Sequence, residues 1–335
     1  MREGGAGLID LSARGRILLS GTEVVTFLNG LITNDMKTLA VNSWMPAAFP
    51  NVQGRLLAGI GVIRRDDGFL IDTESATRET VLKLLERFTL AGDFQVTDVS
   101  GATAMLSVQG QKAAAVVDTV LGDEAAQVER HSVATARLGD GSRVDTIRAT
   151  HTGEDGFDLL IDSDAAGKLR SLLTEAGADC VEPEALETLR IEAGIARYGI
   201  DMDETNVVTE TNLDDAVSFS KGCYIGQEII ARIKYRGHVA KKLTGVIADS
   251  ALALESGAKI LSVDEKEIGR VTSFTFSPQL QRTIAMAYLK YDYLAPGTAV
   301  KIRSSEVDCP AVVAELPFVR GSWYTESEPP AVAGG

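Results

Sequence analysis

The chain has 335 residues, enough for two or three domains, and its 45% hydrophobic and 24% charged residues are typical of a soluble globular protein. A formal net charge of −14 argues against a surface that binds nucleic acid or an anionic membrane throughout. Three widely separated cysteines, Cys180, Cys223 and Cys309, form no CxxC pair. With no signal-peptide pattern and no apolar run near ~20 residues, they favour a cytoplasmic protein that does not enter the membrane.

Strand and helix patterns alternate through the first hundred residues. Arg16–Ser20 has the pattern of a strand, and Thr22 is a suitable N-cap for a helix that reaches about Leu31. A second helix is expected over 77–88, where the apolar residues lie on one face. Further strands are predicted at 46–50, 56–63, 69–73 and 94–99.

The same order of elements then starts again. A strand is predicted at 104–108 and a helix at 112–121, followed by strands and a last helix at about 133–137, 143–149, 157–161 and 165–175. Two passes of strand, helix, several strands and helix predict an α+β fold. Its two halves, at about 1–100 and 101–240, are each expected to be ferredoxin-like.

A third unit is expected near the C-terminal end. Pro183 opens a helix that stops at Gly194, and an extended acidic segment follows over 199–220. From 241 to 320 short strands recur at regular intervals, which indicates a small β-barrel or sandwich. Residues 321–335, with Glu-Pro-Pro and a terminal Gly-Gly, are expected to form a disordered tail.

The segment from Lys221 to Glu228 reads Lys-Gly-Cys-Tyr-Ile-Gly-Gln-Glu and concentrates several reactive groups. The residues after Gly226 have the pattern of a helix start, so Cys223 would lie near a helix N-terminus and near the Lys221 ammonium. Both features lower a thiol pKa, which makes Cys223 and Lys221 catalytic candidates. The alternative is a glycine-punctuated turn with a half-buried cysteine.

Other chemical groups are sparser. Glu192 lies at the border of an apolar helix face and could accept two parallel hydrogen bonds from a pterin, or could simply pair with Arg190 or Arg197. The acid-free run from Arg232 to Lys242 could bind an anionic ligand tail or an acidic partner, or could be a solvated surface. Histidine and cysteine spacing predicts no metal site, and no glycine-rich phosphate loop is present.

With these residues in view, the chain resembles the YgfZ-type folate-binding proteins, a branch of the glycine-cleavage T-protein superfamily. The octapeptide 221–228 carries the resemblance, and the stretches Phe27–Asp35, Gln53–Arg55 and Arg190–Gly199 support it. The resemblance implies a GcvT-like folate-binding region, a C-terminal β-barrel and a central cavity for tetrahydrofolate or another reduced folate. Residues implied to hold the ligand or to form the octapeptide loop are Glu192, Asn34, Arg55, Tyr198, Tyr224, Arg232, Arg236, Gly222, Gly226, Gln227 and Glu228.

One departure separates two functional hypotheses. Aminomethyltransferases of the superfamily carry an Asp near the strand that corresponds to Leu56–Arg65, and here that strand has no acid. The first hypothesis is therefore a monomeric, folate-binding accessory protein that supports iron–sulfur cluster assembly or repair, and through it tRNA modification. Its partners would be iron–sulfur assembly proteins or client enzymes. The alternative is a folate-dependent one-carbon transferase of the aminomethyltransferase type.

Overall fold

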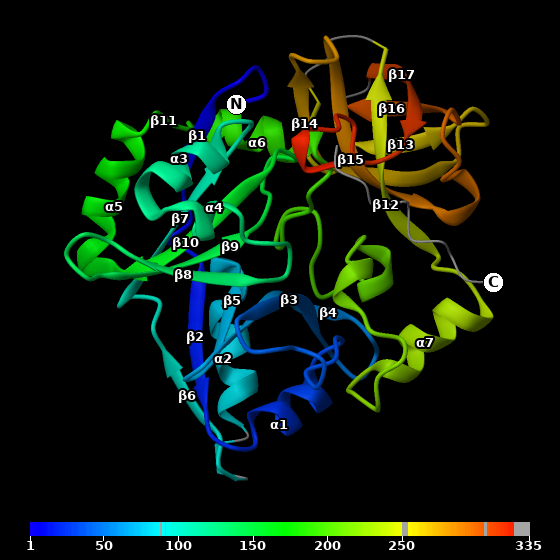
Figure 1. The fold of residues 1–335 in the computed structure, drawn as a ribbon. Coiled ribbons are helices and arrows are strands. Elements are labelled where there is room, and N and C mark those ends of the chain that lie inside the picture. Colours follow the sequence, from blue (N-terminus) through cyan, green and yellow to red (C-terminus); the bar gives the residue numbers. More distant parts are fainter. Residues whose placement is uncertain (88, 91, 250–253, 305–306, 325–335) are drawn as a thin grey trace.

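The computed structural model describes residues 1–87, 89–90, 92–249, 254–304 and 307–324, which form two α+β units and a barrel (Figure 1). The first unit is an antiparallel sheet with strand order β3-β4-β5-β2-β6. Its strands are Gly15–Ser20 (β2), Ser43–Pro50 (β3), Leu56–Arg65 (β4), Gly68–Thr73 (β5) and Gln95–Asp98 (β6). Each overlaps a strand predicted from the sequence.

Two helices cover one face of this sheet. They are α1 (Val24–Leu31) and α2 (Arg78–Glu86). Buried Leu28 of α1 and Val81 of α2 pack against Ile17, Val62 and Ile71 of the strands. Burial alternates along β4: Leu56, Ala58 and Ile60 are buried, and the residues between them are partly exposed. This period of two residues is typical of a strand with one face in a core.

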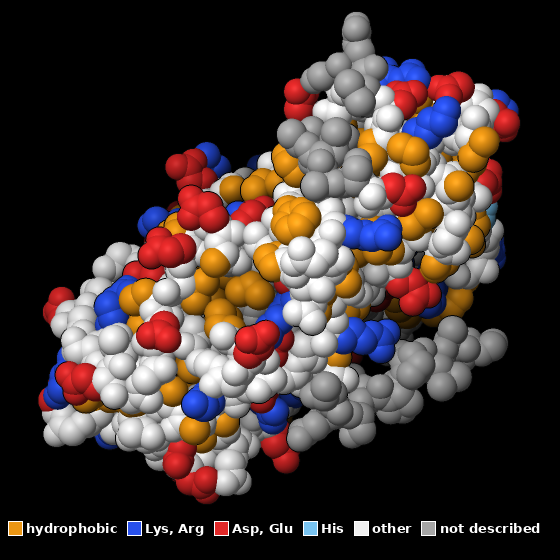
Figure 2. All heavy atoms as spheres, turned by 90° about the horizontal axis from the view of Figure 1, so that it is seen from above, with side chains coloured by type: hydrophobic (Ala, Val, Ile, Leu, Met, Phe, Trp, Pro, Cys, Tyr) orange, Lys and Arg blue, Asp and Glu red, His pale blue; other side chains and the backbone are white. Residues whose placement is uncertain are grey.

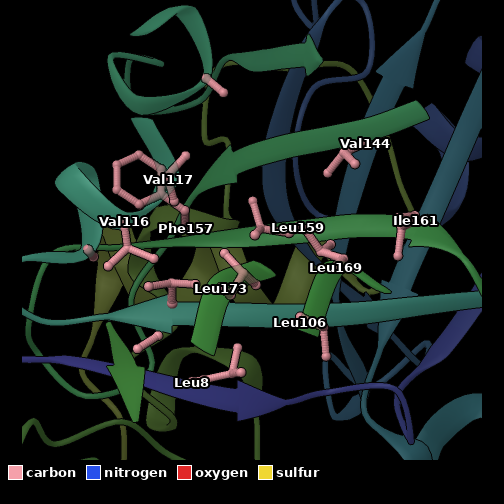
Figure 3. Close-up of a cluster of buried hydrophobic side chains, with 14 of the residues drawn as sticks. Leu8, Leu106, Val116, Val117, Val144, Phe157, Leu159, Ile161, Leu169 and Leu173 are labelled. Atoms are coloured by element: carbon pink, nitrogen blue, oxygen red, sulfur yellow. The ribbon is translucent and has the colours of Figure 1, made fainter. Parts of the chain in front are cut away.

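The second unit is a six-stranded sheet with order β11-β1-β7-β10-β9-β8. Its strands are Ala6–Asp10 (β1), Thr103–Gln109 (β7), Val133–Arg137 (β8), Arg143–Arg148 (β9), Gly156–Asp162 (β10) and Ala178–Cys180 (β11). Its helices are α3 (Ala113–Leu121), α4 (Asp123–Ala126) and α5 (Ser163–Glu175). Figure 3 shows the core between them, in which Phe157 and Leu159 of β10 meet Val117 of α3 and Leu169 of α5.

The boundary expected between the two halves does not hold for the first strand. β1 belongs to the second sheet, where Leu8 lies opposite Val108 of β7 and pairs in parallel with Cys180 of β11. The chain thus begins in the second unit, forms the first, and returns. A strand whose partners lie 100 residues (Leu8 to Val108) and 172 residues (Leu8 to Cys180) further along the chain leaves little local signal beyond its short apolar run.

The C-terminal unit is a closed six-stranded barrel, as the resemblance implied, with order β12-β15-β14-β13-β16-β17. Its strands are Lys241–Ala248 (β12), Lys259–Ser262 (β13), Glu267–Ser277 (β14), Arg282–Lys290 (β15), Ala299–Ser304 (β16) and Val307–Ala314 (β17). All six of these strands lie within 241–320, where the sequence predicts recurring short strands.

The stretch between the second sheet and the barrel is shared among the units. α6 (Pro183–Glu192) packs on the barrel, where Thr188 and Thr275 hydroxyls are 2.9 Å apart. The short turns η2 (Val208–Glu210) and η3 (Asp214–Ala216) and the helix α7 (Gln227–Arg236) pack instead on the first unit. Residues 101–240 are therefore not one spatial unit.

Two further expectations concern the surface and the C-terminal end. Residues 321–324 are packed, with Gly321 buried and the turn η5 at Ser322–Tyr324, so the expected disorder does not hold there. Residues 325–335 lie outside the described residues. Acidic and basic side chains are interspersed over the face in Figure 2. Within the described part of the chain, no helix is long and apolar enough to span a membrane.

Candidate functional site

A cavity of about 480 Å³ lies between the first unit and the second unit. Residues from the stretch 193–216 and from the C-terminal turn, Trp323 and Tyr324, complete its lining. Its floor includes Gly59 and Gly61 of β4, and aromatic side chains line it at Trp44, Tyr198 and Trp323. Such a volume lies within the range of sites for drug-sized ligands. Two adjoining hollows continue it. One, of about 380 Å³, shares Arg14, Glu74 and His151 with the cavity, and a more open one of about 530 Å³ faces the barrel.

The first polar cluster of the cavity is built on Arg14 and Asp72. Asp72 lies on β5 directly opposite Gly61 of β4, and a methyl group at Gly61 would be in ordinary van der Waals contact with the Asp72 Cβ, at 3.8 Å. Arg14 holds the Asp72 carboxylate with two parallel hydrogen bonds, Nε to Oδ1 at 3.0 Å and Nη2 to Oδ2 at 2.6 Å, and also pairs with Glu74 at 3.2 Å.

The second polar cluster is the pair of His151 and Asp158. His151 lies in the loop between β9 and β10, and its Nε2 is 3.0 and 2.9 Å from the two carboxylate oxygens of Asp158. Burial alone would lower the pKa of His151, but the Asp158 charge and hydrogen bond outweigh it and raise that pKa. Burial alone would raise the pKa of Asp158, yet His151, Ser107 and Arg14 together lower it. The contact with Asp158 therefore makes protonation of His151 more favourable than in a free histidine, and the Asp158 carboxylate stays ionised to lower pH than a free aspartate.

Two protein-family models and a set of curated relatives match almost the whole chain. Residues 1–221 match the GCVT N-terminal domain, and residues 241–320 match the glycine cleavage T-protein C-terminal barrel domain. A curated aminomethyltransferase of Rubrobacter xylanophilus is 31% identical over 316 residues, covering 94% of this chain and 83% of that relative. The chain belongs to the glycine-cleavage T-protein family.

Other members of the T-protein family support the same placement. The aminomethyltransferase of Thermotoga neapolitana is 29% identical over 326 residues, which cover 96% of this chain and 88% of that relative. The crystal structure of aminomethyltransferase T of the glycine cleavage system from Bartonella henselae has the same fold, with a TM-score of 0.84 at 23% identity. It covers 95% of this chain and 87% of its own.

The expectation of an iron–sulfur accessory role is wrong. The relatives compared, from several bacterial genera, are named aminomethyltransferases, and they support the T-protein family as a whole without favouring its YgfZ-type branch. The expectation had relied on the lack of an acid in β4. That strand indeed brings only Gly59, Ile60 and Gly61 to the cavity, but the neighbouring strand β5 supplies Asp72.

The octapeptide 221–228 forms a loop of this T-protein fold that lies outside the cavity lining. Lys221 is 7% exposed, and its Nζ donates hydrogen bonds of 2.8, 2.9 and 2.6 Å to the carbonyl oxygens of Asn29, Ile32 and Asn34. Burial lowers its pKa to about 8. Lys221 thus ties the end of α1 to this loop. Its ammonium is committed to backbone carbonyls, while Cys223 is exposed.

The rest of the octapeptide explains how the loop enters α7. Gly226 is the N-cap in the left-handed region at φ 78°, and a side chain there would collide with the Asn51 carbonyl. Gln227 reaches back weakly to the Lys221 and Gly222 carbonyls at 3.4 Å, and Glu228 is exposed. The helix expected after Gly226 is confirmed. The segment is a structural junction between α1, the loop at Asn51–Arg55 and α7.

Of the ligand-holding residues predicted from the sequence, Tyr198 lines the cavity. Asn34 donates to the backbone carbonyls of Pro46 and Asp215, and Arg55 donates to the Thr205 carbonyl at 2.7 Å. Burial raises the pKa of Tyr224 to about 12, since its ring packs in the apolar cluster beneath α7. Arg232 and Arg236 are exposed on α7 and form no ion pair with the described residues.

Glu192 lies next to the cavity but outside its lining. It is 2% exposed, accepts a hydrogen bond from the Ser277 hydroxyl and pairs with Arg2. Ala193 and Gly194, which follow Glu192 in the chain, do line the cavity. Neither Arg190 nor Arg197 pairs with it. Arg190 bonds to Asp201, and both arginines bond to Glu187.

The acids and the histidine of the cavity were not identified from the sequence. Asp72 and Asp158 each interrupt an apolar strand, in Phe-Leu-Ile-Asp and in Phe-Asp-Leu-Leu-Ile. A carboxylate within an apolar strand is costly unless it is paired or functional, so this pattern was a usable signal. Their convergence with Arg14 and His151 depends on the packing of two units against each other.

Proposed function

We propose that this chain is a folate-dependent aminomethyltransferase that transfers an aminomethyl group to tetrahydrofolate in a glycine-cleavage reaction. The observation that carries the proposal is the Asp72 carboxylate, which enters the cavity from β5 opposite Gly61 of β4. β4 carries no acid, and the neighbouring strand β5 brings one to the cavity lining. Relatives named aminomethyltransferase along nearly the whole chain support the same reading.

The lining suits a reduced folate. Trp44, Tyr198 and Trp323 offer aromatic faces for flat rings, and the backbone at Gly59 and Gly61 permits close approach. Convergent polar groups together with aromatic surface orient a ligand that is partly polar and partly flat.

The charges suit transfer of a cationic one-carbon fragment. Two parallel hydrogen bonds from Arg14 fix the orientation of the Asp72 carboxylate, so its charge need not reorganise as the reaction proceeds. A fixed carboxylate stabilises positive charge that develops on an aminomethyl carbon and nitrogen.

The test is replacement of the T-protein by this chain in a reconstituted glycine-cleavage assay with tetrahydrofolate. Formation of methylenetetrahydrofolate and ammonia at a rate that saturates with tetrahydrofolate is the expected result. If the chain binds tetrahydrofolate but supports no transfer, the enzymatic assignment is wrong.

A further inference from the structure

We infer that His151, oriented by Asp158, is the group that takes up and returns the proton during transfer. This inference rests on the proposed aminomethyl transfer and deepens it. The loop that carries His151 comes from the second unit, whereas Asp72 comes from the first. The cavity would thus combine an electrostatic group from one unit with a proton-transfer group from the other.

The geometry leaves one ring nitrogen available. Nε2 of His151 contacts both oxygens of Asp158, a residue that is 8% exposed, so this side of the ring is fixed. Nδ1 forms no hydrogen bond with any described residue, and His151 lines both the cavity and the adjoining hollow. A carboxylate behind one nitrogen and an accessible second nitrogen is the arrangement in which a histidine exchanges protons with a ligand.

Three other ionisable groups of the cavity, Arg14, Tyr198 and Asp72, are less suited to this task. Arg14 cannot release its proton near neutral pH. Burial raises the pKa of Tyr198, and the carboxylates of Glu204 and Asp203 raise it further, away from neutrality. The Asp72 carboxylate is held by Arg14 as an acceptor. An imidazole is the side chain whose ordinary pKa is nearest neutral pH.

The charges that face His151 come from several elements. Asp158 on β10 and Asp72 on β5 raise its pKa, while Arg14 lowers it. Glu74, which follows β5, borders both the cavity and the hollow of about 380 Å³, as His151 does. The remaining charged side chains of the adjoining hollow are Asp10, Arg190 and Arg197. The resulting rise favours a proton exchanger that works near neutral pH.

During transfer, a proton passes from the folate to the donor atom through His151. The electron pair of a folate amine nitrogen forms a bond to the aminomethyl carbon, and the bond from that carbon to the donor atom breaks with its electron pair going to the donor. The attacking nitrogen loses its proton to neutral His151. The resulting imidazolium then returns that proton to the donor atom. Ammonia leaves the folate-bound aminomethyl carbon as the second folate amine nitrogen bonds to that carbon, and the proton of this nitrogen goes to the departing amino group, so no outside oxidant or acid is consumed.

The test compares wild type, His151→Ala and Asp158→Asn in the reconstituted transfer assay over a range of pH, with tetrahydrofolate affinity as a check of folding. His238→Ala is the matched control, because that ring stacks on Tyr291 outside the cavity lining. We expect His151→Ala to lower kcat by roughly 10²–10⁴-fold and to regain part of it with added imidazole. Asp158→Asn should move the acidic limb of the pH profile to lower pH, because it removes the carboxylate that raises the pKa of His151.

The outcomes separate the two ideas. If wild type transfers but His151→Ala keeps its rate within about threefold and its pH profile, the role of His151 is refuted while the function stands. If His151→Ala loses tetrahydrofolate affinity through misfolding, the pH profile of Asp158→Asn decides, and an unmoved limb refutes the inference. If wild type supports no transfer, the proposed function falls, and the role of His151 with it.

Discussion

The buried ammonium of Lys221 should make the stability of this protein rise with pH in mildly alkaline solution. Burial lowers its pKa from 10.5 to about 8 in the folded chain. Between these two values the unfolded chain binds more protons than the folded one. The free energy of unfolding therefore increases as pH rises through this window, and the penalty of the buried charge is fully present below about pH 8.

The size of the effect follows from the two pKa values. At ~1.4 kcal/mol per pKa unit, the free energy of unfolding should rise by about 2 kcal/mol between about pH 7 and pH 9.5. Lys221→Met should abolish this rise. At the higher pH the variant should also be less stable than wild type by on the order of 1–3 kcal/mol, because the carbonyls of Asn29, Ile32 and Asn34 lose their donor.

Urea unfolding followed by tryptophan fluorescence at the two pH values measures both quantities. Lys234→Met is the matched control, because Lys234 is exposed on α7 and should leave the wild-type pH dependence intact. The same rise in Lys221→Met as in wild type would refute the structural role assigned to this ammonium.

Two further substitutions test neighbouring features. Gly226→Ala should lower the free energy of unfolding by about 1–3 kcal/mol, because it places a side chain at φ 78° and against the Asn51 carbonyl. Gly222→Ala is the control and should be nearly neutral, because a methyl group there has no atom within 4 Å. Equal effects of the two substitutions on urea unfolding would contradict this prediction. Glu192→Gln should lower stability by on the order of 1–3 kcal/mol, because it breaks the buried contact with Arg2, and should change tetrahydrofolate affinity by calorimetry by less than about twofold. A tenfold loss of affinity would instead show that Glu192 turns into the cavity to hold the pterin.

Local patterns predicted most of the elements because each element buries one face. β2, β4, β5 and β10 follow from short apolar runs, and α7 follows from Gly226 and the acid-to-base order after it. β1 and β11 were missed because three to five residues acquire strand structure only through distant partners. No local sequence pattern indicates which unit each part of residues 183–240 packs against.

The site was less predictable than the fold because its groups meet only through tertiary packing. The octapeptide drew attention as a dense set of reactive residues, yet Lys221 satisfies the carbonyls at the end of α1 and Gly226 permits a tight junction. Asp72 was not predicted as a site residue because the acid was expected on β4, whereas in an antiparallel pair the adjacent strand can bring a side chain to the same face. The proposed function therefore rests on the residues of the cavity and not on the octapeptide.

The most direct test of the central claim is the rate of tetrahydrofolate-dependent aminomethyl transfer by wild type, Asp72→Asn and the matched control Asp67→Asn, whose carboxylate lies exposed in the β4–β5 turn. Loss of the fixed charge should lower kcat/KM by roughly 10²-fold or more in Asp72→Asn and leave Asp67→Asn at the wild-type rate. Transfer by Asp72→Asn at the wild-type rate, or no transfer by wild type that binds tetrahydrofolate, would contradict the account.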